Sequence, residues 1–340
     1  MKRLVTTRPG EVELWDDAPE PVVGPGDALI AIEAVGICGS DVHLFLGDHP
    51  YSHFPNVQGH EFAGTVLSLP GDYRGPLRVG ERVAVEPLLM CGTCLPCRRG
   101  RGNCCVQMRT YGAQIDGALT ERMAVPARLL YSAGGIDAEV AALVEPYSIG
   151  MHAVARSGLE AGDTAVVYGA GPIGLTILSA AVDRGARVLM VDSLPGRLAL
   201  AHVLGADSTV AVGAGRSADD QIAEWTSGDG PVVVFEATGS PDVLRSAIEV
   251  VAPSGTVVIV GLSKQPVSVP MVHFTRKELT VIGSRNNMGV FGKAAAMVAR
   301  DPERARRLIT HRFTLDRAAE AFEVALHSPE TTEKVVISIK

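Results

Sequence analysis

The second half of the chain repeats a short apolar run followed by a helical stretch, and this pattern narrows the possible folds most. Buried parallel strands are continuous apolar runs, and parallel strands need crossover connections that are usually helices. The pattern therefore predicts a doubly wound parallel α/β sheet, a Rossmann sheet, over residues 148–285. The expected strands are residues 165–168, 188–191, 208–212, 232–235, 257–260 and 279–282, and residues 172–184 form one of the expected helices.

The first 147 residues follow a different pattern, in which short β-type runs are broken by Gly and Pro. The clearest runs are residues 28–34, 63–67 and 82–85. Such runs predict a mainly antiparallel, barrel-like domain. A final run at residues 334–339 is expected to rejoin this domain. Since 340 residues exceed what one core usually supports, we expect two domains, residues 1–147 with 286–340, and residues 148–285.

Charge and hydropathy exclude two kinds of partner. The net charge is −7, and no run of basic residues is longer than the pair Arg98 and Arg99, so a nucleic-acid partner is not expected. No apolar segment approaches the ~20 residues of a membrane span, and the N-terminus has no signal-peptide run. We therefore expect a cytoplasmic protein without a membrane partner.

A glycine-rich loop follows the first expected strand of the second domain and opens its first helix. It reads Gly169, Ala170, Gly171, Pro172, Ile173 and Gly174. Glycines let the main chain approach a pyrophosphate, which the N-terminus of the helix then attracts. In this context the loop predicts a dinucleotide site. The alternative is a glycine turn in an α/β domain that binds no nucleotide.

The residues after the next expected strand bear on the choice of dinucleotide. Asp192 ends that strand, where a carboxylate accepts hydrogen bonds from both hydroxyls of a ribose and repels a 2'-phosphate. This favours NAD over NADP. Arg197 follows five residues later, and its guanidinium could face the adenine or a phosphate.

Four cysteines in one loop form the most regular motif of the chain. Cys91, Cys94, Cys97 and Cys105 are spaced so that four thiolates can converge on one tetrahedral ion. We expect a structural zinc in a lobe at about residues 88–108. A disulfide pair or an empty lobe is the alternative, and Cys104 is left over as a thiol.

A second set of metal-type residues lies outside that lobe. Cys38 stands alone, His60 and Glu61 are adjacent, and Glu145 lies near the domain junction. A thiolate, an imidazole and a carboxylate suit a catalytic zinc with one open position, and Glu145 is a candidate fourth donor. Taken singly, each has an ordinary alternative, because a lone Cys is usually a small buried residue and a lone Glu is usually solvated.

These motifs resemble, in the same order, those of the zinc-dependent medium-chain dehydrogenases, in particular the sorbitol, threonine and sugar-acid dehydrogenase branch. The resemblance covers essentially the whole chain and implies a GroES-like first domain. It implies that Cys38, His60 and Glu61 ligate a catalytic zinc, and that Glu145 ligates it or holds its water. It also implies two zinc ions per chain and assembly as a dimer or tetramer.

A mechanism follows as a hypothesis. The zinc would act as a Lewis acid toward a secondary alcohol, whose hydride would pass to the nicotinamide. Ser40 and His43 would relay the proton to solvent; the alternatives are a turn hydroxyl for Ser40 and a surface imidazole for His43. Arg285 resembles the family arginine near the substrate, and a guanidinium suits a polyhydroxylated or carboxylate-bearing substrate. Its alternative role is on the nicotinamide side or in pairing a glutamate.

The remaining cofactor contacts are expected in loops after later strands, because ligands of a doubly wound sheet bind at the strand ends. These residues are Thr238, Gly261, Leu262 and Ser284. Residues 256–261 and 267–270 are apolar and could supply a sheet edge for pairing between subunits.

The leading interpretation is an NAD-dependent zinc enzyme that oxidises a secondary hydroxyl of a polyol, sugar or sugar acid, for example a hexonate, to a ketone. Alternatives within enzymes are a threonine-type dehydrogenase and a simple secondary alcohol dehydrogenase. From another class, the chain could be a non-catalytic nucleotide-binding sensor or scaffold. Sorbitol dehydrogenases resemble each other in a tyrosine where this chain has Leu44.

Overall fold

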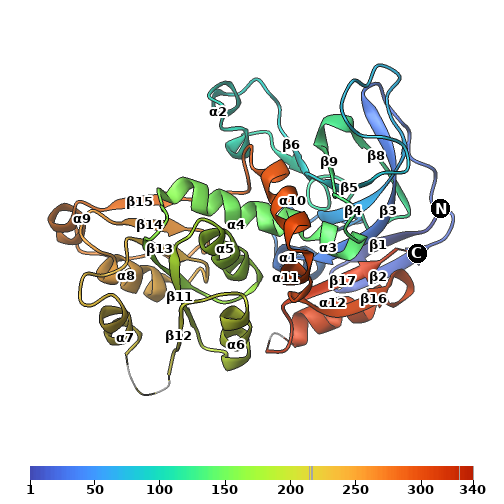
Figure 1. The fold of residues 1–340 in the computed structure, drawn as a ribbon. Helices are drawn as coiled ribbons and strands as arrows, with labels where there is room; N and C mark the ends of the chain where they lie inside the picture. The colour runs from blue at the N-terminus through green and yellow to red at the C-terminus, as the bar shows by residue number, and fades with distance from the viewer. Residues whose placement is uncertain (214, 216, 329, 340) are drawn as a thin grey trace. The chain divides into compact units, whose positions relative to one another are not determined.

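The computed structural model describes residues 1–213, 215, 217–328 and 330–339. The chain forms two compact units, each with its own apolar core. The first unit is Met1–Glu145 with Met288–Lys340, and the second is Pro146–Asn287 (Figure 1).

The second unit is built on one six-stranded sheet in which every pair of neighbours is parallel. The strand order is β12 (Ser208–Ala211), β11 (Arg187–Asp192), β10 (Thr164–Tyr168), β13 (Val233–Glu236), β14 (Thr256–Ile259) and β15 (Thr280–Gly283). The chain runs outward from β10 first on one side and then on the other, so the predicted doubly wound sheet is confirmed. Each predicted strand end lies within one residue of the observed end.

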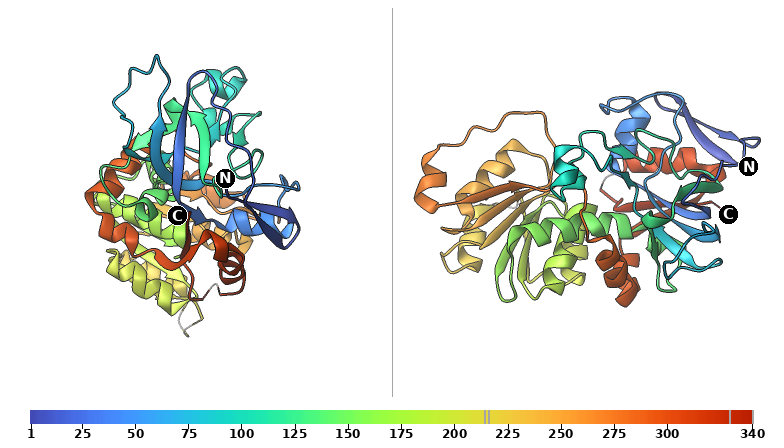
Figure 2. Two further views of the ribbon diagram at one scale, coloured as in Figure 1. Left: turned by 90° about the vertical axis from the view of Figure 1, so that its right-hand side faces the viewer. Right: turned by 90° about the horizontal axis from the view of Figure 1, so that it is seen from above.

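Helices cover both faces of this sheet (Figure 2). They are α4 (Val144–Ser157), α5 (Pro172–Asp183), α6 (Pro195–Val203), α7 (Ala218–Trp225), α8 (Pro241–Val250) and α9 (Val272–Lys277). Between the layers, Val166, Leu189 and Val234 are completely buried. Burial of each such side chain contributes about 1.5–3 kcal/mol, and together these contacts hold in place the strands that flank the glycine loop.

The prediction of a sheet edge at residues 256–261 is wrong. β14 occupies most of that segment and lies between β13 and β15, so both of its sides are paired. The apolar run reflects an interior strand, which is buried on both faces. Residues 267–270 form no strand, and β15 is the edge strand of the sheet on that side.

The first unit contains a seven-stranded, mainly antiparallel sheet. Its strand order is β16 (Ile309–Thr314), β17 (Lys334–Ser338), β3 (Asp27–Ile37), β4 (Glu61–Ser68), β5 (Arg82–Val85) and β9 (Leu130–Ser132), and β8 (Arg122–Pro126) also pairs with β3. Only β16 and β17 pair in parallel among the neighbours of this sheet in the described part of the chain. The predicted antiparallel character is therefore confirmed.

Shorter elements complete the first unit. The strands β1 (Arg3–Arg8) and β2 (Glu11–Trp15) form a hairpin, and β6 (Leu88–Leu89) pairs with β7 (Arg109–Thr110). The helices are α1 (Gly39–Leu46), α2 (Leu95–Arg98), α3 (Ala138–Ala142), α10 (Phe291–Arg300), α11 (Pro302–Arg306) and α12 (Ala318–His327). No described helix is both long enough and apolar enough to cross a bilayer.

The C-terminal strand β17 lies inside the sheet of the first unit, between β16 and β3, where Figures 1 and 2 show red and blue strands side by side. Val335 pairs with Ile37, and Val336 with Gly36. These residues are buried, as are Phe45 and Phe322, whose rings stack 4.9 Å apart. The end of the chain therefore contacts the strand that leads into Cys38.

Candidate metal centres and cofactor loop

The four cysteines of the lobe come together in the structure. The Sγ atoms of Cys91 and Cys97 lie 4.0 Å apart, and those of Cys94 and Cys105 lie 3.8 Å apart. Thiolates held about 2.3 Å from a tetrahedral ion are separated by roughly 3.8 Å. The spacing of the sulfurs therefore fits zinc. The leftover Cys104 lies outside the cluster.

Main-chain amides surround these sulfurs. The N–H of Cys94 donates to Cys91 Sγ at 3.3 Å, and the N–H of Cys91 donates to Cys105 Sγ at 3.3 Å. Hydrogen bonds from Thr93 and from the main chain lower the pKa of Cys91 to about 6. Since the thiolate is the ligand form, this environment favours Cys91 as a ligand. Burial and the neighbouring cysteines instead raise the pKa of Cys97 to about 12.

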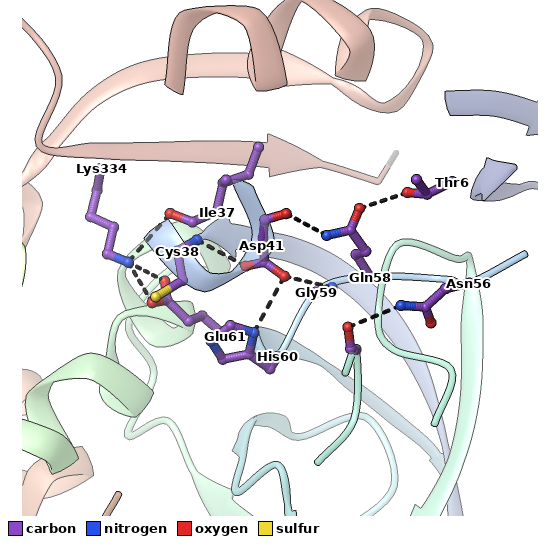
Figure 3. Close-up of polar contacts among 11 residues, drawn as sticks. Thr6, Ile37, Cys38, Asp41, Asn56, Gln58, Gly59, His60, Glu61 and Lys334 are labelled. Carbon is purple, nitrogen blue, oxygen red and sulfur yellow. Dashed lines mark hydrogen bonds and ion pairs between the residues drawn. The ribbon is translucent and has the colours of Figure 1, made fainter. Parts of the chain in front are cut away.

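Cys38, His60 and Glu61 also converge, with potential ligand atoms all within 4.8 Å of one another. Cys38 precedes α1, Glu61 begins β4, and His60 lies in the loop just before that strand. A thiolate, an imidazole and a carboxylate at this distance fit a zinc ion, and three protein ligands leave a fourth position free. Figure 3 shows these residues and their polar contacts.

Local sequence explains how Cys38 and Glu61 reach this position. Cys38 is the N-cap residue of α1, which places it at the positive end of the helix dipole. Gly36 pairs with Glu61 across β3 and β4. A Cβ atom at Gly36 would overlap the Glu61 carboxylate, so the glycine leaves the space that this side chain fills.

Asp41 is a site residue that our sequence analysis missed. Its carboxylate is buried, accepts from Cys38 N–H at 2.9 Å and lies 3.4 Å from His60 Nδ1. Burial opposes a charged imidazole, but Asp41 and Cys38 together outweigh burial and raise the pKa of His60 well above its usual value. A carboxylate behind a ligating histidine fixes the ring orientation. The available signal was an acidic residue in the first turn of a helix, three positions after its N-cap.

Lys334 was also missed. It begins β17, is 2% exposed, and its Nζ contacts both carboxylate oxygens of Glu61, with a distance of 2.6 Å to Oε2. Burial opposes its charge, but Glu61 and Cys38 outweigh burial and raise the pKa of Lys334. A buried ammonium needs such partners, because an unpaired buried charge is strongly unfavourable. The sequence held no signal for this role, because a lysine at the start of an apolar strand is usually an exposed strand end.

Glu145 lies at the end of the first unit, in the first turn of α4. It is 7% exposed, and burial raises the pKa of Glu145 to about 7. The charges of His60 and Lys334 lower this pKa, and the charge of Glu61 raises it. The structure thus places Glu145 in the electrostatic environment of the Cys38, His60 and Glu61 cluster.

The two candidate relay residues occupy different environments on α1. Ser40 is half-buried in the first turn. His43 is exposed, and its Nδ1 lies 2.9 Å from Asp48 Oδ1. His43 therefore has a carboxylate neighbour on the solvent side of the helix.

The glycine loop joins β10 to α5, as predicted. Gly169 has a φ of +95°, and Gly171 is the N-cap residue of α5, which begins at Pro172. Ile173 follows in the first turn and is half-buried. A Cβ atom at Gly174 would overlap the carbonyl oxygen of Gly169, so only glycine permits this close turn. The N-cap residue of α5 makes no side-chain capping hydrogen bond, and the N-terminus of such a helix can bind a phosphate group.

Asp192 and Arg197 both lie beside this loop. The Asp192 carboxylate accepts from Ala170 N–H at 2.6 Å and from Leu194 N–H at 2.8 Å. The guanidinium of Arg197 is close to Gly171, since a Cβ atom there would lie 3.4 Å from Nη1. One anionic and one cationic side chain therefore flank the predicted dinucleotide loop.

The other predicted cofactor residues lie after β13, β14 and β15 of the second unit. The buried Glu236, which sequence analysis also missed, accepts from Thr238 N–H at 2.7 Å and Gly239 N–H at 2.8 Å and thereby holds the first of these loops. A Cβ atom at Gly261 would overlap Gly239 N, whereas Leu262 is 95% exposed. Ser284 and Arg285 follow β15; Ser284 is half-buried and Arg285 is exposed.

Two family models match the chain. The model for the alcohol dehydrogenase GroES-like domain matches residues 24–134, and the model for zinc-binding dehydrogenases matches residues 172–300. Among characterised relatives, the chain is 35% identical over 325 residues to L-galactonate-5-dehydrogenase of Escherichia coli, covering 95% of this chain and 94% of the relative.

Solved structures agree with this assignment. The chain has a TM-score of 0.91 and 30% identity to the rspB alcohol dehydrogenase of E. coli CFT073 in complex with NADH, covering 100% of this chain and 99% of that one. It has the same TM-score and 31% identity to a zinc-binding dehydrogenase of Sinorhizobium meliloti bound to NADP, covering 99% of each chain. The chain therefore belongs to the zinc-dependent medium-chain dehydrogenase family and is an oxidoreductase of the alcohol dehydrogenase type, with a GroES-like domain.

Proposed function

We propose that this protein is an NAD-dependent zinc enzyme that oxidises a secondary hydroxyl of a polyol, sugar or sugar acid to the ketone. The observation that carries the proposal is the convergence of Cys38, His60 and Glu61 within 4.8 Å. A mixed set of three ligands leaves a position for substrate, unlike the four-thiolate cluster, which is closed. The proposal includes two zinc ions per chain.

Each residue of the cluster has a proposed task. Cys38, His60 and Glu61 hold the catalytic zinc, and Glu145 is the candidate fourth donor or the residue that positions a water. When bound, zinc supplies a Lewis acid that makes an alcohol easier to deprotonate. Ser40 and His43 pass the released proton to solvent, and the exposed imidazole beside Asp48 suits the outer end of that path.

The choice of NAD rests on Asp192. A carboxylate beside the glycine loop suits the two ribose hydroxyls and disfavours a 2'-phosphate. Arg197 lies against Gly171 and is proposed to face the dinucleotide as well. Thr238, Gly261, Leu262 and Ser284 are proposed to complete the cofactor contacts. Because structural relatives carry either NADH or NADP, both dinucleotides belong in the test.

The substrate class rests on two observations. The relative that is 35% identical acts, by its name, on L-galactonate, a sugar acid. Arg285 follows β15 with an exposed side chain, and a guanidinium can bind a carboxylate through two hydrogen bonds. We therefore place Arg285 on the substrate side and expect sugar acids to be better substrates than simple alcohols.

The test is NADH formation by zinc-loaded protein with aldonates, polyols, simple secondary alcohols and threonine, with NADP in parallel. Turnover of an aldonate or polyol with NAD, abolished by a chelator, is the expected result. Turnover of threonine alone or of simple alcohols alone would assign one of those activities instead. A protein that holds one zinc and oxidises nothing would support a non-catalytic role.

Assembly and location complete the proposal. We propose a homo-oligomer, a tetramer or a dimer, formed by the nucleotide-binding unit, where β15 is an edge strand available for pairing. We also propose a cytoplasmic location, because thiolate ligands persist in a reducing compartment. Sedimentation of the zinc-loaded protein distinguishes two chains from four.

A further inference from the structure

A buried polar side chain precedes the metal-binding segment of residues 59–61. Gln58 is 1% exposed. Its Oε1 accepts from the hydroxyl of Thr6 at 2.6 Å, and its Nε2 donates to the main-chain oxygen of Asp41 at 2.6 Å (Figure 3). A buried carboxamide is unfavourable unless it is hydrogen-bonded, and both of its ends are bonded here.

These partners allow only one orientation of the carboxamide. The Asp41 carbonyl oxygen can only accept, so the amide nitrogen must face it. Oε1 then faces Thr6 and can only accept, so the Thr6 hydroxyl must donate. Thr6 is itself held in place by two main-chain hydrogen bonds. Its N–H donates to the carbonyl oxygen of Asn56 at 2.8 Å, and its carbonyl oxygen accepts from Asn56 N–H at 3.0 Å. Gln58 thus connects a fixed strand residue to α1.

Asp41, the residue that Gln58 holds, contacts both segments of the candidate metal site, the one at Cys38 and the one at residues 59–61. The Asp41 carboxylate accepts from Cys38 N–H at 2.9 Å, lies 3.4 Å from His60 Nδ1, and accepts from Gly59 N–H at 3.4 Å. Asp41 is 1% exposed, so solvent cannot replace these contacts. A shift of the first turn of α1 would therefore move the carboxylate away from the imidazole.

We propose that Gln58 is a positioning residue of the Cys38, His60 and Glu61 zinc site, and that its carboxamide acts through Asp41 with the Thr6 hydroxyl as its anchor. This inference rests on the proposed function, since it requires a zinc at that site. Partners outside the ligand shell typically change metal affinity about 10- to 100-fold. Because Gln58 contacts the metal ligands only through Asp41, we expect its loss to weaken zinc affinity by about tenfold, the lower end of that range.

The test compares zinc loss to a chelator from the wild-type protein and from Gln58→Met, which keeps the length of the side chain and removes its hydrogen bonds. Zinc should leave the Cys38 site about tenfold faster in the variant. The zinc of Cys91, Cys94, Cys97 and Cys105 should leave at the wild-type rate and serves as an internal reference. With Co²⁺ in place of zinc, the absorption spectrum of the Cys38 site should also change.

Thr6 provides an independent route to the same result. Thr6→Val removes the hydroxyl and should speed zinc loss, whereas Thr6→Ser keeps the hydroxyl and should restore the wild-type rate. In the double variant Thr6→Val with Gln58→Met, the effects should not add, since both changes break the same connection. If Gln58→Met does not fold, the Thr6 pair decides the proposal.

Thr65→Val is a matched control. The Thr65 hydroxyl donates to Glu33 Oε1 at the same distance of 2.6 Å, on β4 of the same unit. This variant should lower the Tm without changing zinc loss or the Co²⁺ spectrum. If Gln58→Met and Thr6→Val also lower only the Tm, the positioning role is wrong. A wild-type protein that holds only the four-cysteine zinc would overturn the proposed function along with this inference.

Discussion

The two candidate metal clusters of the first unit are built in opposite ways. The four cysteines lie within 15 residues of sequence, and most of them are only partly buried. Cys38, His60 and Glu61 come from two segments, and the ion pair behind them adds Lys334 from the last strand. A local loop can position all four of its metal ligands by itself. An open site whose ligands come from separate segments needs the surrounding fold to fix each ligand.

Removal of one ligand from the open site should give the largest effect. We expect Cys38→Ser to reduce turnover at least about a thousandfold, because loss of the Lewis acid removes several kcal/mol of stabilisation of the transition state. Zinc content should fall from two to one per chain, measured by atomic absorption. Cys104→Ser is the matched control, since Cys104 lies outside both clusters, and it should keep both ions. Two ions in Cys38→Ser would contradict the ligand assignment.

Lys334→Met should show how far the open site depends on the rest of the fold. The change leaves the buried Glu61 carboxylate without its ammonium partner, which typically costs about 3–5 kcal/mol of unfolding free energy. Urea unfolding measures the loss, which should be larger in the Cys38→Ser background, where no zinc faces Glu61. Lys334→Arg keeps the charge and should recover part of the stability. Equal stability of Met and Arg variants would show that the ion pair contributes little.

Cys94→Ser tests the closed cluster and should separate stability from activity. We expect loss of one zinc and a decrease of about 2–3 kcal/mol in unfolding free energy, a fraction of the roughly 10–16 kcal/mol by which structural zinc stabilises small zinc-dependent peptides. Turnover per catalytic zinc should stay close to wild type at low temperature. A thousandfold loss of turnover in this variant would mean that the two clusters are not independent.

The smallest effect is expected at an exposed ion pair of the same unit, between Asp137 and Arg306, whose side chains are 41% and 36% exposed. Burial would raise the pKa of Asp137, but hydrogen bonds from Arg306 and from Val140 N–H lower it. Because the folded pKa is depressed, the stabilisation is present above the unfolded pKa of about 3.9 and disappears as the pH falls through the folded value.

Asp137→Asn keeps the oxygen that caps α3 and removes the charge. We expect a loss of about 0.5 kcal/mol at neutral pH, since exposed pairs contribute little. Urea unfolding at pH 7 and at pH 3 should show the difference between variant and wild type shrinking at the lower pH. A difference that is unchanged between the two pH values would exclude the charge as its source.

The sequence predicted the strands of the second unit for a physical reason. Strands such as β10 and β11 are uninterrupted apolar runs, and a parallel sheet with helical crossovers follows from their order. The interior position of β14 was not predictable from its apolar character alone, because edge and interior strands are distinguished by their neighbours. That was the source of the wrong edge assignment.

At the candidate metal site, sequence spacing indicated the ligands but not the residues that support them. Cys38, His60 and Glu61 are recognisable as residue types that bind zinc. Lys334 reaches Glu61 across 273 positions of sequence, through the pairing of β17 with β3. No local pattern encodes that pairing, so a lysine before Val335 and Val336 resembles an ordinary exposed strand end.

The interior position of β17 also has a consequence for synthesis of the chain. A nascent chain emerges from the ribosome N-terminus first. All six strands of the second unit, the last of which ends at Gly283, therefore emerge before Lys334 does. The second unit can fold while translation continues, whereas the sheet of the first unit stays incomplete until the final strand inserts beside β3. Glu61 acquires its ammonium partner in that last step, so a nascent chain stalled shortly before residue 334 has every proposed metal ligand but lacks the lysine that pairs with one of them.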